Sequence, residues 1–250
     1  MKIRVGSLLD LSTIDWPGHR TFMLFCSGCN FRCPFCMNAS LIPLNSGGEI
    51  DLNLVEDRVM ENIGFLDAIG ATGGEPGLQP GPITELYSWA KKRGIKTFLN
   101  TNGSNPKLIE ELLTKSLLDH MAIDVKAPLI PDIYGKVTGL NEGIDKILIN
   151  IRQSLELCRK ANISVEVRTT VVPTLINGEQ AIREVARIAK DYDSYVLQQF
   201  FPLKEVLDER LRRVKPPDRA TLAKLARLSL GEGVKAVYIR TQKNGMERIE

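Results

Sequence analysis

From residue 21 to residue 36 the chain reads Thr-Phe-Met-Leu-Phe-Cys-Ser-Gly-Cys-Asn-Phe-Arg-Cys-Pro-Phe-Cys. The first five residues form a compact apolar run, which is typical of a buried β-strand. In the loop that follows, Cys29, Cys33 and Cys36 have the spacing C-x3-C-x2-C. Three thiolates in one short loop can hold three irons of a cubane cluster and leave the fourth iron with an open coordination position. The spacing therefore favours a catalytic [4Fe–4S] cluster held by these three cysteines.

A second interpretation involves Cys26, because the complete run is C-x2-C-x3-C-x2-C. Four cysteines can close a zinc site or a ferredoxin-like cluster. Zinc sites usually separate two C-x2-C pairs by a long spacer, whereas only three residues separate the pairs here. Cys26 also ends the apolar run, where a small buried side chain fits. The role of Cys26 stays open at this point, and Cys158 is expected to pack in the core.

Outward from this loop, short apolar strands alternate with amphipathic helices. Such alternation predicts an α/β fold of parallel strands with helical crossovers, as a barrel or an open doubly wound sheet. The expected strands are Thr21–Phe25, Asp67–Thr72, Lys96–Leu99, His120–Val125, Ser164–Val172, Tyr195–Phe200 and Val234–Ile239. The expected helices are Leu52–Phe65, Pro82–Lys92, Lys107–Lys115, a helix from Ile144 to at least Leu155, Glu179–Lys190 and Arg219–Leu230.

The polar residues of interest follow the predicted strands. In β/α barrels the chemistry lies at the carboxyl ends of the strands. Glycines permit close backbone approach, and a carboxylate accepts charge-assisted hydrogen bonds. A lysine or arginine at an inward strand end is costly to bury unless a carboxylate offsets that cost. The segments at these ends are the cysteine loop, Gly73–Pro76, Asn100–Gly103, Asp124–Lys126, Arg168 and Gln198–Gln199.

Composition limits the other function classes. The 250 residues are 43% hydrophobic and 25% charged, with a formal net charge of +3 and scattered basic residues, so we expect no dedicated nucleic-acid binder. No apolar run spans a bilayer and no secretory leader begins the chain, which predicts a cytoplasmic protein without a membrane partner. We expect one domain over residues 1–250, with a core at about 20–205 and a C-terminal extension at about 206–250.

The sequence resembles the radical S-adenosylmethionine (radical SAM) superfamily, and more narrowly the glycyl-radical-enzyme activases. These include the activating proteins of pyruvate formate-lyase and of anaerobic ribonucleotide reductase. Three segments carry the resemblance: Ser12–Gly18, Gly28–Cys36 followed by Asn38, and Thr72–Pro76. The resemblance covers about residues 6–205. It implies a partial (β/α)6 barrel of the radical SAM type, with a [4Fe–4S] cluster on Cys29, Cys33 and Cys36 and S-adenosylmethionine on its open iron.

The resemblance also implies roles for single residues. Phe35 lies near the adenine, the Gly73–Pro76 segment receives the ammonium, and Lys126 lies near the carboxylate of S-adenosylmethionine. Aspartates of the family approach a monovalent cation. The expected cofactor-binding residues are Phe35, Asn38, Gly73, Gly74, Glu75, Pro76, Asn100, Thr101, Asp124, Lys126 and Arg168. The expected catalytic residues are the three cluster cysteines and Lys126.

The chain departs from the family pattern at several positions. Asn100 stands where some activases have an aspartate, which would weaken the cation site. Gln198 and Gln199 stand where some relatives place a histidine, and Met37 follows Cys36 where histidine is common. The further cysteines that hold auxiliary clusters in some activases are absent from the five in this sequence.

The resemblance implies reductive cleavage of S-adenosylmethionine to a 5′-deoxyadenosyl radical, which abstracts hydrogen from a glycine Cα of a partner glycyl-radical enzyme. Anaerobic ribonucleotide reductase is the first partner to expect, and flavodoxin or ferredoxin would supply the electron. A radical SAM enzyme acting on a nucleobase, a tRNA or a small metabolite is the alternative. A four-cysteine zinc or electron-transfer module is the non-enzymatic interpretation.

Overall fold

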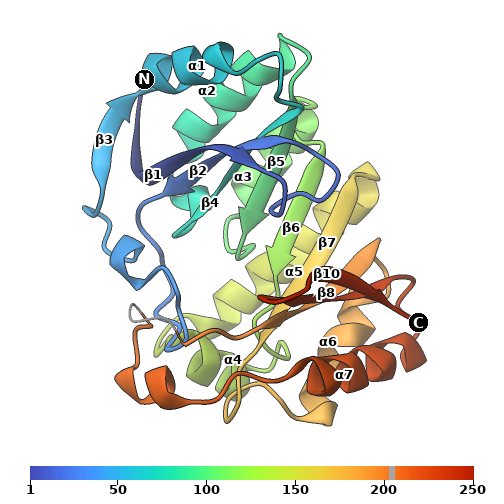
Figure 1. Cartoon of the computed structure of the whole chain (residues 1–250). Helices are drawn as coiled ribbons and strands as arrows, with labels where there is room; N and C mark the ends of the chain where they lie inside the picture. The colour runs from blue at the N-terminus through green and yellow to red at the C-terminus, as the bar shows by residue number, and fades with distance from the viewer. Residues whose placement is uncertain (203–205) are drawn as a thin grey trace. The chain divides into compact units, whose positions relative to one another are not determined.

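The computed structural model describes residues 1–202 and 206–250 (Figure 1). The chain packs into two compact units. Unit 1 contains Met1–Asn30, Ser40–Ala122 and Gln153–Ile163. Unit 2 contains Phe31–Ala39, Ile123–Arg152 and Ser164–Glu250. The prediction of one domain stays a prediction, and its boundary near residue 205 lies outside the described residues.

Unit 1 is built on strands β1 (Lys2–Ser12), β2 (Thr21–Cys26), β3 (Gly48–Asp51), β4 (Ala68–Gly73) and β5 (Lys96–Thr101). Neighbouring strands follow the order β3-β1-β2-β4-β5. The pairs β2–β4 and β4–β5 are parallel, whereas β1 is antiparallel to both β2 and β3. The β2–β4 register places Cys26 opposite Gly73, so the cysteine loop and the Gly73–Pro76 segment leave the sheet side by side.

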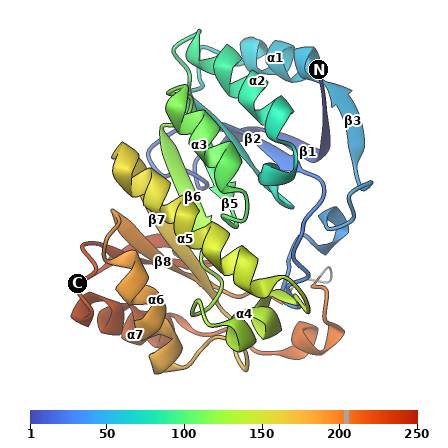
Figure 2. The same cartoon turned by 180° about the vertical axis from the view of Figure 1, so that it is seen from behind.

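Helices α1 (Leu52–Glu61), α2 (Pro80–Lys91) and α3 (Pro106–Thr114) belong to unit 1, together with the 3-10 helix η2 (Pro76–Leu78). The 3-10 helix η1 (Ala39–Leu41) begins with the last residue of a unit 2 segment and continues into unit 1. Helix α2 packs on β4 and β5, and α1 packs on β1 and β3, as Figure 2 shows from behind. Side chains cap the first turns of two of these helices. At α3 the Asn105 side chain accepts a hydrogen bond from the N–H of Leu108, and at η2 the Glu75 side chain accepts one from the N–H of Gly77.

The opposite face of the unit 1 sheet has its own small core. Met23, Phe98 and Ala122 are completely buried there, and Trp16 and Phe25 pack against them. The Trp16 ring stacks on His19 at 3.9 Å and on His120 at 5.1 Å between ring centroids. Both histidines are therefore part of an aromatic stack close to the amino ends of the strands.

Unit 2 contains strands β7 (Ser164–Val171), β8 (Ser194–Gln199), β9 (Val237–Thr241) and β10 (Gly245–Ile249) in that order. The pairs β7–β8 and β8–β9 are parallel, and β9–β10 is antiparallel. Its helices are α4 (Pro131–Thr138), α6 (Glu179–Ala189), α7 (Arg219–Gly231) and the 3-10 helix η3 (Glu209–Arg213). Helix α7 packs on β9 and on α6, and Figure 2 shows α6 and α7 next to each other.

Two further elements, β6 (His120–Asp124) and α5 (Ile144–Ala161), carry the chain from one unit to the other. With them, every strand and helix expected from the sequence is present. The parallel pairing expected from the β–α alternation is confirmed within each unit. Among residues 1–202 and 206–250, no helix is both long and apolar enough to cross a membrane.

Two predicted boundaries are wrong. Helix α1 ends at Glu61 rather than Phe65, and Phe65 is largely exposed beyond it. The last predicted strand begins at Val237 rather than Val234. The N–H of Val234 points back to the carbonyl of Ser229 at the end of α7, so this residue finishes the helix and cannot begin a strand.

Candidate cluster and cofactor site

The cysteine loop begins in unit 1, where backbone hydrogen bonds fix it against the segment after η1. The N–H of Gly28 donates to the carbonyl of Leu41 at 2.8 Å, and the N–H of Cys29 donates to that of Ile42 at 3.0 Å. Gly28 has a φ of 89°, a conformation that glycine adopts without strain. Cys29 is thus presented, partly exposed, from a loop of fixed backbone.

The rest of the loop belongs to unit 2. The N–H of Cys36 donates to the carbonyl of Cys33 at 3.0 Å, which closes a tight turn between the second and third cysteines. The carbonyl of Pro34 accepts from the N–H of Asp208 at 2.9 Å. Cys29, Cys33 and Cys36 form no disulfide bond among the described residues, so the three sulfur donors expected from the spacing are present as thiols.

Asp124 is the last residue of β6 and Lys126 lies two residues later, both in unit 2, and they form an ion pair of 2.8 Å between Lys126 Nζ and Asp124 Oδ2. Both groups act electrostatically on the Cys36 thiol. Burial raises the pKa of that thiol, while the N–H of Asn38 and the Lys126 ammonium oppose the rise. Phe35, between Cys33 and Cys36, is buried. Within unit 2, the predicted site residues Asp124 and Lys126 therefore lie near enough to Cys36 to act on its thiol.

In unit 1 the Gly73–Pro76 segment lies directly on the start of the cysteine loop. Gly73 has a φ of 109°, and a Cβ there would come within 2.5 Å of the Cys26 nitrogen. A Cβ on Gly74 would come within 2.2 Å of the Gly28 carbonyl oxygen. Only glycine fits at either position, which agrees with the close backbone approach expected from the sequence.

Glu75 has partners that the sequence did not predict. Its buried carboxylate accepts from Thr101 Oγ1 at 2.6 Å, from the N–H of Asn102 at 2.7 Å and from the N–H of Gly77 at 2.7 Å. These bonds tie the end of β4 to the end of β5. Thr101 therefore acts with Glu75 within unit 1, and the expected contact between Glu75 and an ammonium stays a prediction.

Asn100 carries an unsatisfied acceptor at the end of β5. Its Nδ2 donates to Thr72 Oγ1 at 2.8 Å, whereas its Oδ1 is buried without a hydrogen-bond partner among the described residues. A buried acceptor without a partner is costly, and a bound ligand that donates a hydrogen bond, or a cation, would satisfy it. Asn100 is thus placed as a cofactor residue would be.

Arg168 lies inside β7 rather than at its end. Its side chain is 2% exposed and forms an ion pair through Nε with Glu166, two residues earlier. Residues i and i+2 of a strand share a face, so the Glu-Val-Arg pattern contained a signal for this pair that the sequence analysis missed. The expected carboxylate partner of the arginine is therefore present in the protein itself.

Gln199 makes structural contacts at the end of β8. Its Nε2 donates to the Pro217 carbonyl at 2.8 Å, and its Oε1 accepts from the N–H of Gln242 at 2.9 Å. Both ends of its amide are thereby used to hold neighbouring chain in unit 2.

Comparison with known proteins identifies the family. Residues 23–192 match the model of the Radical SAM superfamily. The chain belongs to the radical SAM superfamily. The matched range contains all three loop cysteines and every predicted site residue, and the radical SAM family carries with it a [4Fe–4S] cluster and S-adenosylmethionine as cofactors.

Individual relatives narrow the type of radical SAM enzyme. A protein of Methanocaldococcus jannaschii named "Putative glycyl-radical enzyme activating enzyme" is 36% identical over 243 residues, which cover 96% of this chain and 97% of the relative. The pyruvate formate-lyase-activating enzyme of Clostridium pasteurianum is 26% identical over 236 residues, covering 89% and 94% of the two chains. The enzyme is therefore of the glycyl-radical-enzyme activase type.

A solved structure supports the fold. A radical SAM methyltransferase from Sphaerobacter thermophilus matches with a TM-score of 0.68 at 15% identity, over 90% of this chain and 67% of the other. At this identity the match concerns the fold alone. The α/β fold of the radical SAM type, expected from the sequence, is confirmed.

The residues present fit the two cofactors of the superfamily. Three cysteine thiols outside any disulfide match a cluster that leaves one iron open, and the buried Oδ1 of Asn100 has no hydrogen-bond donor among the described residues. Within the described residues, no three His, Cys, Asp or Glu side chains form a group that could hold a single metal ion. Cys29, Cys33 and Cys36 would hold the cluster. Lys126 and Arg168 would face the carboxylate of S-adenosylmethionine.

The other two cysteines of this radical SAM enzyme are core residues. Cys26 is completely buried at the end of β2, and burial raises the pKa of its thiol from 9.0 to about 12. Cys158 is also completely buried, with Sγ 3.6 Å from Met121 Sδ and a pKa of about 12 for the same reason. Core packing of Cys158 is confirmed, and the burial of Cys26 agrees with the three-cysteine interpretation.

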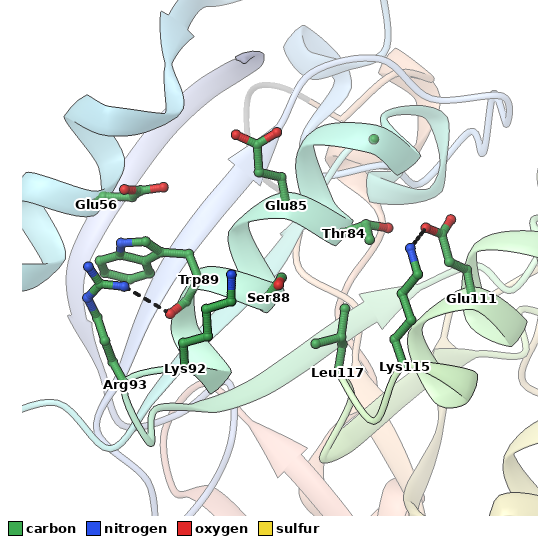
Figure 3. Close-up of a pocket in the computed structure, with 11 residues that line it drawn as sticks. Glu56, Thr84, Glu85, Ser88, Trp89, Lys92, Arg93, Glu111, Lys115 and Leu117 are labelled. Carbon is green, nitrogen blue, oxygen red and sulfur yellow. Dashed lines mark hydrogen bonds and ion pairs between the residues drawn. The ribbon is translucent and has the colours of Figure 1, made fainter.

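A pocket of about 720 Å³ lies elsewhere in unit 1, on the surface of α2 and α3 (Figure 3). The guanidinium of Arg93 lies 4.4 Å from the ring centroid of Trp89 on one side of it, and Lys115 pairs with Glu111 at 2.6 Å on the other. Its charged side chains are of both signs, and none of the predicted site residues lines it. The pocket and the predicted cofactor residues are therefore separate features.

Proposed function

We propose that this enzyme activates a partner glycyl-radical enzyme by removing one hydrogen atom from a glycine Cα, which leaves a backbone radical on the partner. When bound, the cluster and S-adenosylmethionine supply the 5′-deoxyadenosyl radical that accepts this hydrogen. The observation that carries the proposal is similarity to activating enzymes along almost the whole chain.

The residues of the chain have distinct tasks in this proposal. Cys29, Cys33 and Cys36 bind the cluster through three irons. Phe35 and Asn38 contribute to the adenine side of the cofactor, Gly73–Pro76 and Asn100 to the ammonium side. Lys126 and Arg168 balance the negative charge of the carboxylate, because a buried carboxylate needs cationic hydrogen-bond donors.

The remaining parts of the proposal concern the partners and the compartment. Anaerobic ribonucleotide reductase is the partner to test first. An electron carrier such as flavodoxin or ferredoxin reduces the cluster. The cytoplasm is the proposed location, because five cysteines without a disulfide bond persist in a reducing compartment. The monovalent-cation site of the family is proposed to be weak in this enzyme, because Asn100 stands where some activases have an aspartate and contributes no charge.

The experiment begins with anaerobic reconstitution with iron and sulfide, reduction, and EPR spectra with and without S-adenosylmethionine. We expect the cluster signal to change on addition of S-adenosylmethionine and 5′-deoxyadenosine to form. Incubation with the reductase should then give a glycyl EPR signal, with loss of one hydrogen from its C-terminal glycine. A reductase variant with alanine in place of that glycine is the matched control.

The outcomes separate the interpretations. Cleavage of S-adenosylmethionine without a glycyl signal would refute the glycine substrate and direct the search to a nucleobase, a tRNA or a small metabolite. A spectrum that S-adenosylmethionine leaves unchanged, without 5′-deoxyadenosine, would refute the radical chemistry. Cys29→Ala provides the negative control, because one iron then lacks its thiolate.

A further inference from the structure

In unit 2 the end of helix α4 contacts the cysteine loop. The N–H of Arg32 donates to the carbonyl of Thr138, the last residue of α4, at 2.8 Å. One residue earlier in the loop, the Phe31 ring meets the Tyr134 ring edge-on, with 6.2 Å between centroids and 83° between planes. The loop backbone just before Cys33 is therefore attached to α4 by a hydrogen bond and by packing.

Gly139 makes this contact possible. It follows Thr138 with a φ of 67°, the left-handed conformation that ends many helices. A Cβ on Gly139 would lie 2.3 Å from the carbonyl oxygen of Arg32 and 2.8 Å from its carbonyl carbon. Backbone atoms of a loop cannot rotate out of the way as the end of a long side chain can. Any side chain at position 139 must therefore displace the loop, the helix end, or both.

The chain that leads into α4 contains the two charged residues of the predicted site, Asp124 and Lys126. Asp124 and Lys126 lie a few residues before α4, and both act on the Cys36 thiol. The stretch from Asp124 to Gly139 thus contacts the cysteine loop at Arg32 through its end, and the charges at its beginning act on Cys36. A displacement at Gly139 would change the position of the Cys33–Cys36 turn relative to Lys126.

We propose that Gly139 is a positioning residue for the cluster. Because it has no Cβ, the end of α4 can hold the backbone of Arg32, and this contact places Cys33 and Cys36 for iron binding. The proposal rests on the proposed cluster site of Cys29, Cys33 and Cys36. It concerns the geometry of the loop and not the chemistry of the thiols.

Gly143 provides a matched control. It also has a φ of 67°, yet a Cβ at position 143 would meet nothing within 4 Å. Asparagine tolerates the left-handed conformation better than other residues with a Cβ. Gly139→Asn and Gly143→Asn therefore impose the same small backbone cost, and only the first adds an atom in the space next to Arg32.

Each protein is reconstituted with iron and sulfide, and three properties are measured: bound iron, the EPR spectrum of the reduced cluster, and the rate of iron loss to a chelator. For Gly139→Asn we expect loss of iron about tenfold faster than in the wild type, as when supporting residues around a metal site are changed. We also expect an altered EPR spectrum. For Gly143→Asn we expect wild-type values, with the circular dichroism of both cluster-free variants showing that they are folded.

Wild-type iron retention and an unchanged spectrum in Gly139→Asn would overturn the proposal, as would equal losses in both variants. If Gly139→Asn does not fold, amide hydrogen exchange of the cluster-free wild type replaces it. The Arg32 amide should then be protected like the interior amides of α4, and exchange at the rate of an exposed loop would overturn the proposal. A wild type that binds no iron would instead refute the proposed function.

Discussion

The ammonium of Lys126 lies 2.8 Å from the carboxylate of Asp124, two residues earlier, with 17% and 19% of the two side chains exposed. This ion pair is mostly buried and lies at the strand end where a cofactor carboxylate is expected from the sequence. Asp124 orients the lysine, and Lys126 also opposes the rise in the pKa of the Cys36 thiol. The pair thus places two opposite charges near the third cysteine of the loop.

Replacement of Lys126 by methionine should weaken binding of S-adenosylmethionine. The loss of one charge-assisted hydrogen bond costs about 1.5 kcal/mol or more, which corresponds to roughly tenfold in Kd. Titration calorimetry of the reconstituted enzyme with S-adenosylmethionine measures this change. Lys136→Met, which removes an exposed lysine on α4, is the control and should leave Kd unchanged. Wild-type affinity in Lys126→Met would show that the lysine does not contact the cofactor.

Cys26 should be dispensable for the cluster. Cys26→Ala should retain the full iron content of the wild type, whereas alanine at Cys29, Cys33 or Cys36 should abolish stable binding, because each ligand thiolate holds one iron. Iron analysis after reconstitution tests both statements. Iron loss in Cys26→Ala comparable to that in Cys29→Ala would revive the four-cysteine interpretation.

The pKa of Cys26 also predicts a pH dependence of stability. The folded thiol has a pKa of about 12, against 9.0 for an ordinary thiol, so its proton is lost more easily from the unfolded chain. Its contribution to stability is therefore present below about pH 9 and declines as pH rises toward 12. Urea unfolding of cluster-free protein should show a smaller alkaline loss in Cys26→Ala than in the wild type. An identical alkaline loss would contradict the burial of this thiol.

The fold could largely be predicted from the sequence because its central strands are continuous apolar runs. A strand such as Thr21–Cys26 is buried along nearly its whole length, and composition alone identifies it. Strands β1 and β10, which were not predicted from the sequence, are not continuous apolar runs. β1 exposes Leu9 and Leu11 and contains charged residues, and β10 is an edge strand in which only Ile249 is buried. Helix α4 was missed because it has only 8 residues and contains Gly135.

The site was less predictable because much of it is made by backbone groups. Glu75 accepts from the N–H groups of Asn102 and Gly77, and Arg32 donates to the carbonyl of Thr138. Any residue type supplies such groups, so no sequence pattern marks them. The motif predicted that Glu75 would be important, whereas its partners could only be found from the fold. Glu166 could have been predicted, since it shares a strand face with Arg168.

Because the buried carboxylate of Glu75 accepts three hydrogen bonds, its replacement should lower the stability of the fold strongly. Glu75→Gln turns one acceptor oxygen into an N–H₂ group that faces an N–H donor. We expect the free energy of unfolding to fall by about 2 kcal/mol, the cost of leaving a buried hydrogen-bonding group unsatisfied. Urea unfolding of the cluster-free protein measures it. Glu85→Gln, at a half-exposed glutamate 3.9 Å from the amino terminus, should change stability by less than about 0.5 kcal/mol. Equal effects of the two changes would contradict the structural role of Glu75.

The Arg168–Glu166 pair allows stability to be separated from function. Glu166→Leu or Arg168→Met alone should lower the free energy of unfolding by about 3 kcal/mol, because each leaves a buried charge without its partner. The double variant removes both charges, and its stability should return close to that of the wild type. If Arg168 also binds the carboxylate of S-adenosylmethionine, the restored double variant should still bind this cofactor about tenfold more weakly. Unfolding curves and titration calorimetry on the same three variants separate the two roles. A double variant with wild-type stability and wild-type cofactor affinity would assign Arg168 a structural role alone.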